Sequence, residues 1–104
     1  MSRGPDVAAL LARALLADAG AMGCAVAVGD SSWTRWASAT FAGARHVMEL
    51  HAMPSPYLDA WLSQLPEAEF ALRGNLVADL VVEVVRREAG GVTVSLEVLT
   101  IEER

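Results

Sequence analysis

The chain has little cysteine, few aromatic residues and no long apolar run. Its single cysteine, Cys24, cannot form an internal disulfide, which favours a reducing compartment such as the cytoplasm. Aromatic residues make up 6% of the 104 residues, whereas hydrophobic residues of all kinds make up 54%. The core must therefore consist mainly of alanine, valine and leucine, and so apolar a chain is not intrinsically disordered.

Positive charge is also scarce. Eight basic residues stand against thirteen acidic ones, so the formal net charge is −5. An acidic chain is repelled by a phosphate backbone and by an anionic membrane surface, so we expect neither nucleic acid nor a membrane as partner. The apolar runs, such as residues 7–12 and 25–28, are far shorter than the ~20 residues that span a bilayer. Polar residues also interrupt the N-terminal Ala/Leu stretch, unlike a signal peptide, so we expect a soluble, cytoplasmic protein.

No catalytic, phosphate, metal or cofactor signature is present. The chain lacks a Gly-x-Ser-x-Gly nucleophile turn, and its glycines do not lead from a strand into a helix as in phosphate-binding loops. His46 and His51 are five residues apart on a predicted strand, so they lie on opposite faces and cannot share one metal ion. The apolar neighbours of Cys24 disfavour its reactive thiolate. We therefore predict no catalytic residue, no metal and no cofactor, and an interaction role rather than an enzyme.

Two stretches have the pattern of amphipathic helices. Residues 7–19 are strong helix formers with one apolar stripe, and Gly20 is placed to end the helix. Ser55 is a good N-cap, and Pro56 suits the first helical position. The apolar residues of 58–65 then follow the spacing of a single buried stripe, which predicts a helix that covers a sheet.

The remaining apolar residues have the pattern of strands. Residues 24–28, bounded by glycines, predict a short buried strand. Residues 33–53 alternate with a period of two and break at residues 42–43, which predicts a hairpin with a two-residue loop. Residues 76–85 and 92–101 are rich in β-branched side chains and predict a second hairpin with a three-residue loop.

The predicted elements fit one α+β domain over residues 1–104. Two helices and four or five strands form a two-layer sandwich in which a mainly antiparallel sheet is covered by the helices. The predicted order is α-β-β-β-α-β-β.

The C-terminal hairpin is apolar on both faces. Helices can cover one face, but the opposite face also carries five apolar side chains, namely Val77, Val81, Val85, Leu99 and Ile101. At roughly 25 cal/mol per Å² of apolar area, their burial would contribute several kcal/mol to an association before its entropic cost. We predict an interface here, most simply in a homodimer, because a two-fold axis lets one patch serve both subunits. Another protein is an equally good cover, and plain β-propensity on a solvated face is the alternative explanation.

The register that produces these faces has one unfavourable consequence. It pairs Val82 with Val98 and brings Glu83 directly opposite Glu97. Like charges across a strand pair destabilise a sheet unless a cation lies between them or the side chains turn into water.

A competing hypothesis places a small-molecule site or a small enzyme on the outer face of hairpin 33–53. Trp36, Arg45, Glu49 and His51 combine an aromatic surface, a base, an acid and an imidazole on that face. Such a set suits a small polar ligand, or acid–base chemistry by Glu49 or His51. Any solvated sheet face has a similar composition, which is the simpler interpretation.

Overall fold

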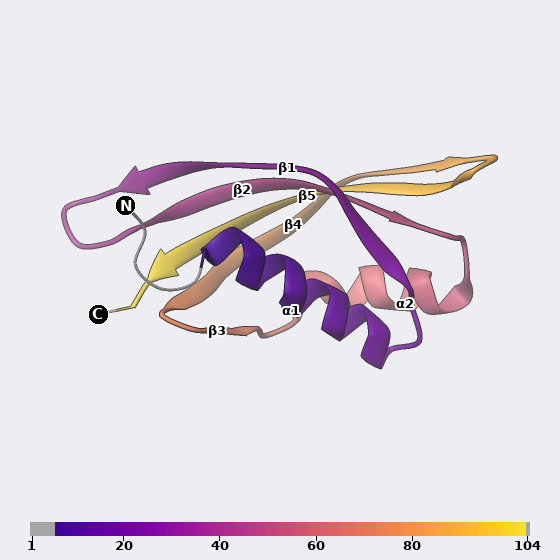
Figure 1. Ribbon diagram of the computed structural model, residues 1–104, viewed down its shortest axis with the longest axis horizontal. Coiled ribbons are helices and arrows are strands. Elements are labelled where there is room, and N and C mark those ends of the chain that lie inside the picture. Colours follow the sequence, from indigo (N-terminus) through magenta and orange to yellow (C-terminus); the bar gives the residue numbers. More distant parts are fainter. Residues whose placement is uncertain (1–5, 104) are drawn as a thin grey trace.

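The computed structural model describes residues 6–103. Its elements are α1 (Val7–Ala21), β1 (Val26–Ala37), β2 (Ala42–Ala52), α2 (Pro56–Gln64), the short 3₁₀ helix η1 (Leu65–Glu67), β3 (Ala71–Leu72), β4 (Asn75–Glu88) and β5 (Gly91–Glu102). The strands form one antiparallel sheet in the order β1-β2-β5-β4-β3. Both α-helices lie on the same side of this sheet (Figure 1). The predicted α+β sandwich is confirmed, and among the described residues no helix covers the outer face of the sheet.

The division into strands differs from the prediction. The expected separate strand at residues 24–28 is the first part of β1, which continues to Ala37 through a bulge between Val28 and Ser31. The short strand β3 was not foreseen, and the observed order is α-β-β-α-β-β-β. Gly29 and Asp30 have the composition of a turn but bend the strand instead, because β2 pairs with β1 on both sides of them.

Helix α1 begins and ends at recognisable caps. The Asp6 side chain accepts a hydrogen bond from the amide of Ala8 at 3.0 Å, which satisfies one free N–H of the first turn. The helix passes the predicted stop at Gly20 and ends where Gly23 adopts a φ of 86°. There the amides of Gly23 and Cys24 donate to the carbonyls of Gly20 and Ala19, which is a Schellman motif. No helix within residues 6–103 is long and apolar enough to cross a membrane.

Helix α2 begins as predicted. Ser55 Oγ accepts a hydrogen bond from the amide of Leu58 at 3.0 Å, and Pro56 occupies the first helical position. Leu58, Trp61 and Leu62 are buried on the predicted stripe. Together with the buried stripe of α1 and alternate residues of β2 and β5, they form the core between the helices and the sheet.

The first hairpin has a four-residue loop instead of the predicted two-residue loop. A two-residue loop at residues 42–43 would pair Ala37 with Met48, but Ala37 pairs with Ala42, a shift of six residues. The loop over residues 38–41 is closed by a 2.7 Å hydrogen bond from the Ser38 amide to the Phe41 carbonyl. Because the shift is even, the residues predicted to share a face within the paired strands still share it.

The second hairpin contains two bulges that the sequence did not reveal. Glu88 pairs with Gly91, so the loop has two residues instead of three, and Val82 pairs with Leu96. The register shifts between Val77 and Asp79 and again between Val82 and Val84. Each bulge adds one residue to β4, so the side chains beyond it exchange faces.

Candidate functional site

The outer face of the sheet, opposite the helices, carries an apolar surface. Polar side chains lie among its apolar ones. Arg45 and Asp79 flank Leu99, Glu97 lies between Val47 and Val81, and Ser95 lies between Glu49 and Val84. The outer patch, as we name it, consists of Trp36, Val47, Leu76, Val81, Val84, Leu99 and Ile101. Four of these side chains, Val47, Leu76, Val81 and Val84, are between 39% and 51% exposed. Single exposed apolar residues are ordinary, but a cluster on one uncovered sheet face is typical of a binding surface.

The bulges in β4 change which residues belong to this surface. Val81 lies on the outer face as predicted, opposite Glu97. Val77 and Val85 were expected there but lie on the helix side, opposite the buried residues Thr100 and Val94. The expectation for these two valines is wrong because each lies beyond a bulge, where the alternation of faces is reversed.

Leu76 and Val84 lie on the outer face instead of Val77 and Val85. They pair with Ile101 and Ser95, and about half of each side chain is exposed. Period-two spacing would place both on the same face as Leu80 and Val82, which lie on the helix side. No signal in the sequence marks residue 78 or residue 83 as an extra residue, so only the pairing with β5 reveals the exchange.

The predicted contact between Glu83 and Glu97 does not occur. Glu83 lies in the second bulge, and Glu97 faces Val81 instead. Glu97 accepts a 2.7 Å hydrogen bond from Arg45 Nη1, on the neighbouring strand β2. The central acid of the outer face is therefore neutralised within the same chain.

Trp36 lies at one end of the outer patch. It pairs with Gly43, where an added Cβ would lie 1.8 Å from the carbonyl oxygen of Thr100. Only glycine fits this position, so no side chain of β2 lies opposite Trp36. The indole Nε1 is buried and has no hydrogen-bond partner within residues 6–103. The exposed Phe41 lies nearby and shares a shallow cavity with Leu76 and Ile101.

The four residues of the competing ligand-site hypothesis share the outer face but are spread along it. Trp36 pairs with Gly43 at one end of β2, and His51 lies eight positions further along that strand. At about 3.3 Å per residue, these ends are roughly 26 Å apart. Arg45 is engaged by Glu97, and none of the five cavities described within residues 6–103 is lined by more than one of the four.

Glu49 and His51 do lie close together. Glu49 Oε1 is 3.7 Å from His51 Nε2, and Thr93 Oγ1 is 3.4 Å from His51 Nδ1. The imidazole lies over Gly29 at the bulge of β1, where an added Cβ would come within 2.4 Å of Nε2. Both contacts are long for hydrogen bonds, and the ring is open to solvent. The imidazole lines two cavities, of about 250 Å³ and about 380 Å³, and Glu49 lines neither of them.

A histidine on the apolar face suggests a hydrogen-bonded residue at a sheet edge, whereas His46 is fully buried on the inner strand β2, between Ala44 and Met48 on the helix side. Its Nε2 lies 3.1 Å from Thr100 Oγ1, and that hydroxyl donates to the Ala44 carbonyl at 3.4 Å. The other ring nitrogen, Nδ1, is buried and has no hydrogen-bond partner within residues 6–103. Burial lowers the pKa of His46, and the nearby Asp6 partly opposes that shift.

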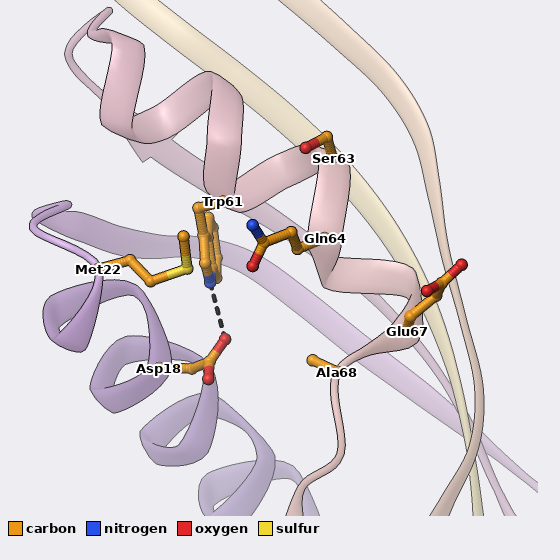
Figure 2. A pocket seen from close by; sticks show the side chains of 7 residues that line it. All are labelled: Asp18, Met22, Trp61, Ser63, Gln64, Glu67 and Ala68. Atoms are coloured by element: carbon orange, nitrogen blue, oxygen red, sulfur yellow. Dashed lines mark hydrogen bonds between the residues drawn. The ribbon is translucent and has the colours of Figure 1, made fainter.

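A groove between the two helices has a volume of about 350 Å³. Figure 2 shows Asp18 of α1 pointing toward the indole of Trp61 in α2. The indole N–H donates to Asp18 Oδ2 at 2.8 Å, while the ring itself is 1% exposed. Asp18 thus satisfies the only polar atom of a core tryptophan, a pairing between helices that the sequence did not indicate.

Chemically reactive groups are scarce elsewhere. Cys24 is buried, and burial raises the pKa of its thiol, so the unreactive form is favoured. Among the described residues, no three His, Cys, Asp or Glu side chains lie together in a way that would hold a metal ion.

Comparison with protein families, with curated proteins and with solved structures finds no match to this chain. Its function must therefore be inferred from the geometry of its own surface.

Proposed function

We propose that this chain is a protein-interaction module that forms a homodimer by packing the outer patches of two copies against each other. The observation that carries this proposal is the exposure of Leu76, Val81 and Val84 on a sheet face without helices. Two sheets packed face to face are a common way to bury such surfaces. A two-fold axis makes one patch complementary to itself, so no second kind of chain is required.

The size of the face supports this proposal. Four strands about 4.8 Å apart and about ten residues long give a sheet face of roughly 600 Å². Stable complexes bury about 800 Å² on each partner, so a contact across most of this face is of the right order.

The charges on the outer face also permit burial. Arg45 and Glu97 form an ion pair at 2.7 Å, so neither enters the contact as an isolated charge. Asp79 and Arg86 lie toward the free side of the face on β4, where they can stay solvated at the rim. We place the protein in the cytoplasm, because its lone Cys24 requires no oxidising environment.

Val81→Glu tests the proposal. A charge introduced into an apolar contact loses its hydration without gaining a partner, so we expect the dissociation constant of the assembly to rise by at least about tenfold. Light scattering over a range of micromolar concentrations would follow the solution mass, starting from the 11.0 kDa of one chain.

Leu16→Glu is the matched control. Leu16 is 38% exposed and Val81 is 39% exposed, but Leu16 lies on α1, in the helix layer. We expect this control to leave association unchanged. Equal masses for both variants and the parent chain would overturn the outer-patch contact. Stabilisation by a small metabolite would then favour the ligand-site hypothesis around Glu49 and His51.

A further inference from the structure

Strand β1 is a long, open edge of the sheet. It pairs with β2 on one side, and within residues 6–103 no strand pairs with its other side. Every residue from 29 to 35 is exposed. Such an edge presents unpaired amides and carbonyls to any strand that approaches.

The backbone groups on this edge can be identified from the hairpin. Ser38 donates its amide to Phe41 across the loop, so Ser38 is a hydrogen-bonded position of the β1–β2 ladder. Hydrogen-bonded positions alternate along an antiparallel pair, so Thr34 and Trp36 also point their backbone groups toward β2. Trp33 and Arg35 therefore point their amides and carbonyls outward.

The two edges of the sheet are not equally protected. The β4 side carries the short strand β3 and two bulges, features that interrupt pairing with another chain. Residues 31–37 of β1 pair regularly with β2 and contain no proline and no bulge. Arg35 is the only charged residue in this segment, and Glu102 of the same chain already pairs with it at 3.1 Å.

We propose that β1 pairs with β1 of a second copy in antiparallel fashion, about a two-fold axis that passes beside Thr34. This register sets Trp33 opposite Arg35 of the other copy, both on the helix side, where a guanidinium can stack on the half-exposed indole. A register centred on Arg35 would oppose two like charges, and one centred on Trp33 would leave Arg35 opposite Ser31. About eight interchain hydrogen bonds form in the favoured register.

This contact goes beyond the outer-patch dimer and does not depend on it. Edge pairing joins two five-stranded sheets into one sheet of ten strands, with both outer patches on the same face. The two-fold axis of edge pairing is perpendicular to the sheet, whereas the axis of face-to-face packing lies parallel to it. Both contacts can therefore operate together, as in a tetramer with perpendicular two-fold axes.

Disulfide trapping tests the register. In the proposed pairing, Thr34 lies opposite Thr34 of the second copy at a non-hydrogen-bonded position. Cα atoms at such a position lie about 4.5 Å apart, which is within the range of a disulfide. We expect Thr34→Cys, in a Cys24→Ala background, to convert to a covalent dimer under mild oxidation. Ser32 is also exposed, but the two copies of Ser32→Cys would be about 13 Å apart, so this variant should stay reduced.

Combination with Val81→Glu separates this proposal from the outer-patch contact. If the edge pairs as proposed, Thr34→Cys still crosslinks when Val81 is also replaced. Equal crosslinking of the Thr34 and Ser32 variants, or none in either, would overturn the edge register. Crosslinking of Thr34→Cys that is lost on adding Val81→Glu would also overturn it, because the disulfide would then depend on face-to-face packing.

Discussion

At the scale of single residues, the two histidines of β2 show that the face of the strand determines the environment of a side chain. His51 lies on the outer face in solvent, beside Glu49, whereas His46 is fully buried on the helix side. The hydroxyl of Thr100 lies 3.1 Å from Nε2 of His46, while the buried Nδ1 has no partner within residues 6–103. A proton added to Nδ1 would find no acceptor, so the fold favours the neutral ring.

The stability of the fold should accordingly depend on pH through His46. Burial lowers the folded pKa below the unfolded value of 6.5, so the unfolded chain binds more protons. Stability is then full above about pH 6.5 and falls as the pH drops toward the lowered pKa. Urea unfolding between about pH 8 and about pH 5 would measure the free energy of unfolding. We expect His46→Gln to weaken the dependence of this free energy on pH, and His51→Gln to retain it. A slope that survives in His46→Gln would assign the dependence to other groups.

At the scale of elements, bulges and close strand contacts decide which side chains reach the surface. The bulges of β4 expose Leu76 and Val84 and turn Val77 and Val85 toward the helices. The contact of β2 with β5 is close at Gly43, where a Cβ would lie 1.8 Å from backbone oxygen. A backbone neighbour cannot move aside as a flexible side chain can.

Gly43→Ala should therefore destabilise the fold by about 1 to 3 kcal/mol, because the strands must separate to admit the methyl group. Gly90→Ala is the matched control, since an added Cβ there meets nothing within 4 Å and the residue has no positive φ. Urea midpoints of the two variants would measure the difference. An equal effect in both would mean that β2 and β5 tolerate a wider spacing at this point.

At the scale of the whole molecule, two kinds of surface stay open within residues 6–103, because both α-helices lie on one side of the sheet and no strand pairs with the outer edge of β1 (Figure 1). One is the outer patch, and the other is the free edge of β1. The two proposed contacts use different chemistry: the patch depends on apolar burial, and the edge depends on backbone hydrogen bonds. Each contact can therefore be removed by a substitution that leaves the other contact in place.

Arg35→Pro should remove the edge contact, because the Arg35 amide points away from β2 and its loss leaves the internal ladder intact. We expect Arg35→Pro alone to keep the outer-patch dimer, and the double variant with Val81→Glu to run as an 11.0 kDa monomer. Arg35→Ala, which keeps the amide, should still pair at the edge and controls for loss of the ion pair with Glu102. Light scattering gives the masses, and a double variant that stays associated would contradict the two-contact scheme.

Much of the fold was predictable because its signals are local. The caps at Ser55 and Pro56 and the buried stripe of α2 follow from residues within a few positions of one another. The candidate site was predictable only in part. Val81, Leu99 and Ile101 lie on the outer face as expected, whereas the assignments of Val77 and Val85 failed.

The sequence by itself determined two amphipathic helices, an antiparallel sheet beneath them and a C-terminal hairpin that is apolar on both faces. Only the tertiary structure decided the four-residue loop of the first hairpin, the continuity of β1 through Gly29 and the two bulges of β4. The physical reason is that strand register depends on hydrogen bonds and side-chain contacts between distant segments. A single inserted residue reverses the faces without altering the local composition that period-two patterns report.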